Sequence, residues 1–255
     1  MGKFDGILLC TDLDGTYTEE LNVCGDNLAY LDYFRKNGGL FTVATGRLPP
    51  YLAGFGDDLP TDVPVITHNG AVIFDREKEK LLYDRPLANA HGEVRETIRY
   101  IMSLGVCDHV DMNAALDWIG MDAALREDDT TVYYKGVVPC DTIEHAYKLV
   151  DALRTRYGEK YCVFRSWSVG VEFLAPDTNK GTALAALKML LGDRVKKTVA
   201  VGDFENDSHM LRAADLGVTV ENGSAEAKAA ADRVVCEYHK GAIAAVIRML
   251  DDEMV

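Results

Sequence analysis

The stretch Ile7-Leu8-Leu9-Cys10-Thr11-Asp12-Leu13-Asp14-Gly15-Thr16 places two acidic residues directly after an apolar run. The apolar part is typical of a strand that is buried on both faces of a parallel sheet. Open α/β sheets carry their active sites at the carboxyl ends of such strands. Residues two apart in an extended chain point the same way, so we expect Asp12 and Asp14 to share a face.

A second acidic strand end lies far downstream, where Val199-Ala200-Val201 runs into Gly202-Asp203-Phe204-Glu205-Asn206-Asp207. Aspartates from both strand ends would repel if they converged, because a like-charge pair ~4 Å apart costs about 4 kcal/mol at an effective dielectric of ~20. Such a cluster requires a cation, and hard oxygen ligands with room for phosphate favour Mg²⁺. The two stretches together therefore predict a magnesium site.

The composition is that of a globular protein with an acidic surface. The chain has 255 residues, of which 48% are hydrophobic and 27% charged, and its formal net charge is −14. That charge argues against nucleic acid and anionic membrane surfaces as partners. We see no signal-peptide pattern and no apolar run near the ~20 residues of a membrane span. None of the six cysteines forms a C-x-x-C pair, and we interpret them as reduced thiols of a cytoplasmic protein.

The first and last thirds of the chain alternate strands with helices. We expect Asp26 to cap a helix that carries Leu28, Leu31 and Phe34 on one side. Further expected strands cover residues 7–10, 40–44, 63–67, 199–201, 217–220 and 233–236, with a hairpin of 72–74 and 81–83. Further expected helices begin at Lys180, pass through Met210, cover 225–230 and close the chain around Val246.

The middle of the chain has a different order of elements. It predicts a helix with Val94, Ile98 and Ile101 on one face, a strand over 130–138, a helix over 143–153 and a hairpin over 161–173. The predicted fold class is therefore α/β, with a doubly wound, Rossmann-like parallel sheet. Residues 1–84 and 176–255 would form that core, and residues 85–175 would form an inserted α+β module.

Four short motifs occur in order along the whole chain: D-x-D-G-T at 12–16, T-G-R at 45–47, N-K-G at 179–181 and G-D-x-x-N-D at 202–207. Together they resemble the haloacid dehalogenase superfamily of phosphohydrolases. The A-T-G-R and N-G-A segments and the long insert resemble its Cof-type branch, which carries a C2 cap. Tyr17 departs from the pattern, since family members usually carry an aliphatic residue there.

The resemblance implies that the acidic pair performs the chemistry. Asp12 would be the nucleophile that accepts a phosphoryl group. Without the other motifs, the same residue would be interpreted as an Asp at a strand end that caps the next turn. Asp14 would be the general acid and base, with its backbone carbonyl on the metal, and it also suits a turn before Gly15. Asp203 would bind Mg²⁺ directly, and Asp207 would bind it less directly or cap the next helix. Glu205 is expected to face solvent.

Phosphate would be held by four residues, namely Thr45, Gly46, Lys180 and Asn206. A lysine at a helix start opposes the helix dipole, so a functional role for Lys180 would offset that cost. A Walker A motif is excluded because the glycine four residues before the G-K pair is missing.

Two more residues have open roles. Arg47 would reach phosphate or substrate, or brace its loop through a salt bridge. Asn69 would contact the substrate side, or only form the Asn-Gly turn.

The sequence therefore predicts a Mg²⁺-dependent phosphomonoester hydrolase that acts on a small phosphorylated metabolite, such as a sugar phosphate, through an aspartyl-phosphate. A phosphomutase of the same superfamily is the alternative. A phosphoryl-accepting regulator fits less well, because its accepting Asp would end the third strand, where Thr67-His68-Asn69 stands. The oligomeric state stays open. Candidate recognition residues of the insert are Trp118, Tyr133, Lys135, Arg165, Trp167 and Glu172.

Overall fold

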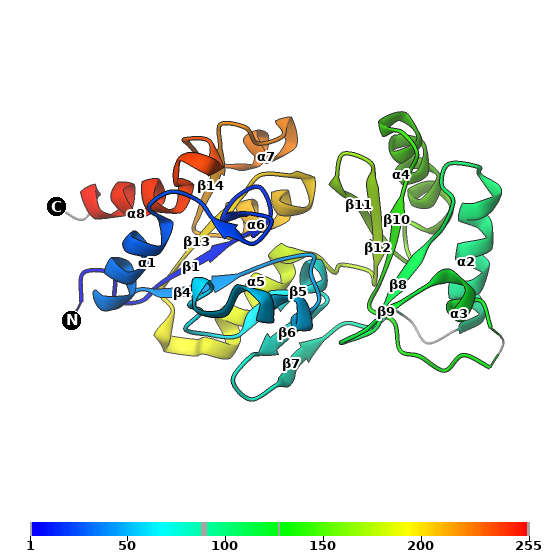
Figure 1. The fold of residues 1–255 in the computed structure, drawn as a ribbon, viewed down its shortest axis with the longest axis horizontal. Coiled ribbons are helices and arrows are strands. Elements are labelled where there is room, and N and C mark those ends of the chain that lie inside the picture. Colours follow the sequence, from blue (N-terminus) through cyan, green and yellow to red (C-terminus); the bar gives the residue numbers. More distant parts are fainter. Residues whose placement is uncertain (1, 88–90, 127, 254–255) are drawn as a thin grey trace.

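The computed structural model describes residues 2–87, 91–126 and 128–253. These residues form two lobes that lie side by side, each built on a five-stranded sheet (Figure 1). The strands of the first sheet are all parallel, in the order β15-β14-β13-β1-β4. The second sheet is antiparallel, in the order β11-β12-β10-β8-β9. The predicted fold class, a parallel-sheet core with an inserted α+β module, is confirmed.

The first strand lies in the middle of the parallel sheet. β1 (Ile7–Thr11) pairs with β4 (Leu40–Val43) on one side and with β13 (Lys197–Gly202) on the other. The chain continues outward from β13 through β14 (Leu216–Val220) and β15 (Arg233–Val235). The strand order reverses at β1, and at such a switch point a crevice opens beyond the carboxyl ends of the strands. Both predicted acidic stretches follow strands at this point.

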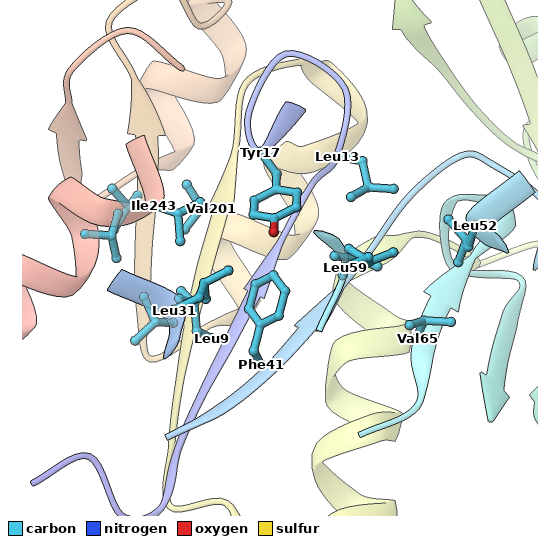
Figure 2. Close-up of a cluster of buried hydrophobic side chains, with 14 of the residues drawn as sticks. Leu9, Leu13, Tyr17, Leu31, Phe41, Leu52, Leu59, Val65, Val201 and Ile243 are labelled. Carbon is cyan, nitrogen blue, oxygen red and sulfur yellow. The ribbon is translucent and has the colours of Figure 1, made fainter. Parts of the chain in front are cut away.

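Helices cover both faces of the parallel sheet, because alternate residues of β1 point to opposite faces. Leu9 packs in one core with α1 and α8, and Leu8 packs in another with α5 and α6. In Figure 2, Leu9 lies in the first core near Leu31 of α1 and Ile243 of α8. The helices of this lobe are α1 (Asn27–Lys36), α5 (Lys180–Leu191), α6 (Ser208–Ala213), α7 (Ala225–Ala230) and α8 (Ala242–Asp252).

Tyr17, the residue that departs from the family pattern, is part of the first core. Its ring is fully buried and lies 5.7 Å from the ring of Phe41 between centroids (Figure 2). The hydroxyl group donates a hydrogen bond of 2.6 Å to the backbone oxygen of Asp58. A buried tyrosine requires such a partner, and here the partner comes from the segment that follows β4.

Two details of α1 differ from the sequence prediction. Asp26 precedes the helix, but its side chain forms no capping hydrogen bond. Its φ of −87° and ψ of 14° are not the extended values from which N-cap side chains usually reach the helix. Leu31 and Phe34 are buried as predicted, whereas Leu28 is 36% exposed. The apolar face of α1 is therefore narrower than the sequence pattern indicates.

The predicted third strand joins the core only weakly. It is reduced to β5 (Val65–Thr67), which is linked to β4 by a single parallel bridge between Ala44 and Ile66. Its main partner is β6 (Val72–Asp75), which in turn pairs with β7 (Lys80–Asp84). The predicted hairpin is thus confirmed, as part of a separate three-stranded sheet.

The second lobe is formed by the inserted segment. Its sheet strands are β8 (Asp111–Asn113), β9 (Trp118–Ile119), β10 (Lys135–Pro139), β11 (Cys162–Trp167) and β12 (Gly170–Leu174). Helices α2 (His91–Ser103) and α4 (Ile143–Tyr157) share a buried core with one face of this sheet. The hairpin of β11 and β12 is confirmed. Of the strand predicted over 130–138, only the part from Lys135 is a strand.

The remaining elements are short: β2 (Thr18–Glu19), β3 (Asn22–Val23), α3 (Met121–Ala124), and the 3₁₀ helices η1 (Pro49–Asp58), η2 (His68–Gly70), η3 (Gly192–Arg194), η4 (Glu205–Asp207) and η5 (Tyr238–Lys240). All six cysteines are free thiols. Among the described residues, no helix combines the length and the apolarity that crossing a membrane requires.

Candidate active site at the carboxyl edge of the parallel sheet

A buried lysine joins the two acidic stretches. The Lys180 side chain is fully buried at the first position of α5, and its Nζ lies 2.5 Å from Asp12 Oδ1 and 2.6 Å from Asp207 Oδ1. Asn179 fixes the start of this helix through a capping box, in which its Oδ1 accepts from the backbone N–H groups of Gly181 and Thr182. A lysine at this end of a helix is disfavoured by the dipole, and the two carboxylates offset that cost.

Three carboxylates converge beside this lysine. Ligand oxygens of Asp12, Asp203 and Asp207 all lie within 4.8 Å of one another. Asp203 accepts a 2.8 Å hydrogen bond from the hydroxyl group of Thr16. Asp207 Oδ2 accepts from the backbone N–H groups of Asp203 and Phe204, at 2.9 and 3.1 Å. The Asp207 side chain therefore stabilises the turn that begins at Asp203. It forms no capping hydrogen bond to α6, so the structure contradicts the alternative that Asp207 caps that helix.

The pKa values reflect the crowding of negative charge. Burial raises the pKa of Asp12 well above its usual range, and the negative charge of Asp207 raises it further. The positive charge of Lys180 lowers this pKa but does not outweigh the other two effects. Burial and the charge of Asp207 raise the pKa of Asp203 to about 7. For Lys180, burial opposes the charged form, but the carboxylates of Asp12 and Asp207 outweigh it and raise the pKa. One ammonium group thus does not neutralise the cluster.

The donor set fits a hard divalent cation. It consists of carboxylate oxygens from two strand ends, which suits Mg²⁺. A further oxygen, Oδ1 of Asn206, belongs to a residue that is only 6% exposed, and it has no hydrogen-bond partner within the described chain. An unpaired buried carbonyl oxygen is costly, so a cation or its water shell would satisfy it.

Asp14 lines the same cleft as Asp12, but its side chain does not join the carboxylate cluster. Its two oxygens accept from Arg47, at 2.6 Å from Nη2 and 2.9 Å from Nε. Arg47 Nη2 also donates to the backbone oxygen of Glu20. Of the two roles open for Arg47, this structure shows the salt bridge.

The residues of the T-G-R motif lie at different depths below the surface of the cleft. Thr45 is fully buried, and its hydroxyl oxygen accepts from the backbone N–H of Arg47 at 3.1 Å. Gly46 lines the cleft, and its backbone oxygen accepts from Lys135 Nζ of the second lobe at 2.9 Å. Thr45 thus lies behind the lining and shapes the loop, while Gly46 meets the inserted lobe.

A chain of hydrogen bonds crosses between the lobes and fixes two amide orientations. Asn69 Nδ2 donates to Glu172 Oε2 at 2.9 Å, and Asn206 Nδ2 donates to Asn69 Oδ1 at 3.0 Å. Ionised Glu172 can only accept, and Lys135 Nζ also donates to its Oε2 at 2.8 Å. Glu172 therefore fixes the orientation of the Asn69 amide, and Asn69 in turn fixes the orientation of the Asn206 amide. In this orientation Oδ1 of Asn206 remains without a hydrogen-bond partner among the described residues. The sequence singled out each of these residues but not their connection.

Glu205 does not face solvent, in contrast to the prediction. Its carboxylate accepts from Arg165 of β11, with Nε 3.1 Å from each oxygen and a closer contact from Nη2. The Arg165 guanidinium also lies 4.1 Å from the ring centroid of Tyr147. This pair joins the second lobe to the turn between Asp203 and Asp207. Sequence pattern alone could not find it, because the partners lie 40 positions apart.

The cleft between the lobes has a volume of about 550 Å³. Of the recognition candidates, Trp118, Lys135, Trp167 and Glu172 line it. Tyr133 does not, because its ring packs in the core of the second lobe. Residues that the sequence analysis did not single out also line the cleft: Leu48, Tyr51, Val137, Ser166, Ser168 and Phe204.

Several known proteins are similar to this chain over nearly its whole length. A phosphoglycolate phosphatase from Natronomonas pharaonis is 26% identical over 96% of this chain and 98% of its own length. Among solved structures, a HAD/COF-like hydrolase from Plasmodium vivax matches with a TM-score of 0.80, at 19% identity over 99% of this chain and 97% of its own. A subclass IIB sugar phosphatase matches with a TM-score of 0.78, at 19% identity over 97% of this chain and 99% of its own.

The sequence profile of haloacid dehalogenase-like hydrolases matches residues 9–134 and 122–247, and so covers both lobes and all four motifs. The solved structures reproduce the same two-lobed arrangement. The chain therefore belongs to the haloacid dehalogenase-like hydrolase family.

Proposed function

We propose that the protein is a Mg²⁺-dependent phosphatase that hydrolyses small phosphate monoesters through an aspartyl-phosphate on Asp12. The observation that carries the proposal is the contact of Lys180 with Asp12 beside the acidic cluster of Asp203 and Asp207. An ammonium group beside an attacking carboxylate lowers its repulsion of a phosphate dianion. The relatives named as phosphatases support the same reaction class.

The reaction divides into two steps. Asp12 attacks phosphorus, the bond to the ester oxygen breaks, and Asp14 gives its proton to the departing alcohol. Water then attacks the aspartyl-phosphate while Asp14 takes a proton from it, which releases inorganic phosphate and restores Asp12. Asp14 is half exposed and lines the same cleft as Asp12. Lys180, Asn206 and the loop of Thr45 and Gly46 would hold the phosphate oxygens.

Asp12, Asp203 and Asp207 would hold Mg²⁺, with the carbonyl of Asp14 as a further ligand. The bound cation would neutralise the charge that develops on the transferring phosphoryl group. Arg47 would hold Asp14 in place, and Asn69 would orient Asn206. The acidic cluster and the hydrogen bonds of Asp14 and Asn206 support these roles, and the carbonyl of Asp14 is the ligand that the family resemblance implies.

We further propose that residues 1–84 and 176–255 form the catalytic core and residues 85–175 a cap that recognises the substrate. The strands of the second sheet, from Asp111 to Leu174, all fall inside that insert. The six free thiols support a reducing, cytoplasmic compartment.

The test is a panel of phosphate esters assayed with Mg²⁺ for free phosphate and for isomerised ester. We expect free phosphate from the wild type, and a loss of ~10⁴-fold or more in Asp12→Asn, as for other nucleophile removals. Asp32→Asn, on an exposed ion pair of α1, is the matched control and should keep full activity. Isomers without free phosphate would show a phosphomutase. Full Mg²⁺-dependent activity in Asp12→Asn would refute the proposal.

A further inference from the structure

A strained loop of the first lobe lies against the start of α5. His68 and Asn69 both have a positive φ, of 52° and 53°, which side chains other than glycine rarely adopt. Gly70 continues this left-handed run with a φ of 105°, and a Cβ there would collide with the backbone oxygen of Asn179. Such a backbone is costly and persists only where its surroundings hold it.

The second lobe contacts this loop at two points. Nε2 of His68 lies 3.0 Å from the backbone oxygen of Ala114, and Nδ2 of Asn69 donates to Oε2 of Glu172 at 2.9 Å. On the side of the first lobe, the backbone N–H of Asn69 donates to the oxygen of Thr45 at 2.9 Å. The Asn69 side chain is fully buried, so its NH₂ group depends on Glu172 for an acceptor.

Glu172 is itself held in one orientation within the second lobe. It is only 2% exposed, and its Oε1 accepts from Oγ of Ser166 at 2.7 Å, while its Oε2 accepts from Nζ of Lys135 at 2.8 Å. Both donors come from neighbouring strands of the same sheet, β11 and β10. The bond from Asn69 is the one that crosses to the first lobe. The carboxylate of Glu172 therefore moves with the second lobe and acts on the amide of Asn69.

This chain of hydrogen bonds ends beside the acidic cluster. Nδ2 of Asn206 donates to Oδ1 of Asn69 at 3.0 Å, which leaves Oδ1 of Asn206 without a partner among the described residues. Asn206 is 6% exposed and lines the cleft together with Asp12 and Asp203. If its amide turned over, an NH₂ group would replace that oxygen, and an NH₂ group cannot bind a cation. The orientation of Asn206 therefore decides whether it offers an oxygen to a cation or to its water shell.

We propose that Glu172 is a positioning residue for the metal site of the opposite lobe, which it reaches through Asn69 and Asn206. The inference rests on the proposed Mg²⁺ site and adds a link between that site and the closure of the lobes. While the lobes are closed, Glu172 holds both amides in the orientation that presents Oδ1 of Asn206, so Mg²⁺ binds more tightly to the closed protein. Such coupling is reciprocal, so bound Mg²⁺ in turn favours closed lobes.

The first test measures the dissociation constant of Mg²⁺ by calorimetry, with no ester present. Asn69→Gly removes the middle amide and suits the positive φ, so the fold should persist. We expect the Kd for Mg²⁺ to rise about 10- to 100-fold, as when other metal ligands lose the partner that orients them. Asn37→Gly, which removes an amide at the end of α1, is the matched control and should leave the Kd unchanged. An unchanged Kd in Asn69→Gly would overturn the proposal.

The second test asks whether Glu172 acts through Asn69. Glu172→Leu combined with Lys135→Met removes a buried ion pair as a whole, so no lone charge is left and the net charge stays the same. We expect the Kd for Mg²⁺ to rise about 10-fold, but to rise no further when both changes are added to Asn69→Gly, because members of one hydrogen-bond network are not additive. Additive effects would contradict the proposal. Lys160→Met with Glu93→Leu, which removes an exposed pair of the same lobe, should leave the Kd unchanged.

A third variant serves if the paired replacement does not fold. Ser166→Ala removes one hydrogen bond to Glu172 at a half-buried position. It should raise the Kd for Mg²⁺ about 2- to 5-fold in the wild type and leave it unchanged in Asn69→Gly. An equal rise in both backgrounds would refute a route through Asn69.

The panel of phosphate esters tests the proposed function separately. Phosphate release together with a Mg²⁺ affinity that does not depend on Asn69 would refute only the positioning role of Glu172. The expected changes in Mg²⁺ affinity without phosphate release from any ester would refute only the phosphatase.

Discussion

At the scale of single residues, the acidic cluster makes the metal-free protein sensitive to pH. The folded-state pKa of Asp203 is raised from its ordinary value of 3.8 to about 7, so the folded protein binds more protons than the unfolded chain between these two pH values. Stability from this group is therefore present at low pH and lost as pH rises toward 7. Burial lowers the pKa of His68 to about 3, which has the opposite effect, because the unfolded imidazole is protonated first.

We expect Asp203→Asn to stabilise the metal-free protein at pH 8, by on the order of 1 kcal/mol or more, and to have less effect at pH 5. The measurement is the free energy of unfolding from urea titrations in EDTA at both pH values. His68 contributes equally to the wild type and the variant, so its effect cancels in the difference between them.

In the wild type, Mg²⁺ should raise the melting temperature more at pH 8 than at pH 6, since protons compete for the carboxylates. A Mg²⁺ shift that is the same in Asp203→Asn would exclude this residue as a ligand.

At the scale of elements, the first turn of α5 decides where Lys180 lies. Its capping box depends on Asn179, so Asn179→Ala should cost ~1 kcal/mol of unfolding free energy and lower kcat. Thr142 caps α4 of the second lobe through one bond to His145 N, so Thr142→Ala should lose a similar stability and keep kcat. Urea titrations and steady-state kinetics separate these effects, and Asn179→Ser should restore most of both losses. Equal kcat values in the two alanine variants would contradict the link between cap and lysine.

At the scale of the whole molecule, the pair of Arg165 and Glu205 holds the two lobes together. Arg165 is 7% exposed in its side chain, so Glu205→Gln leaves a largely buried charge without its partner and should cost ~1–3 kcal/mol. We expect a larger radius of gyration in solution scattering and a higher KM with little change in kcat. Asp128→Asn breaks the exposed pair with Arg126 and should change none of these quantities. An unchanged radius in Glu205→Gln would show that other contacts, such as Lys135 with Gly46, keep the lobes closed.

The arrangement of the four sequence motifs at one edge of the sheet was predictable because it follows from local rules. The apolar run of β1 requires burial on both faces, and the residue after such a strand must lie at the sheet edge. Lys180 follows a capping residue and so begins a helix at that edge. The single bridge between β5 and β4 and the missing side-chain cap of α1 were not predictable. Neighbouring segments, and not the local sequence pattern, determine how many hydrogen bonds each of these segments forms.

The sequence by itself determined the fold class, the family and the residues that gather around the acidic cluster, because strand ends and helix starts are encoded within a few positions. Only the tertiary structure decided which cation pairs with which carboxylate. Arg47 lies 33 positions from Asp14, and Lys135 lies 37 from Glu172. The physical reason is that charges interact through space, so the chain path between two lobes, and not the spacing of residues along it, selects each partner.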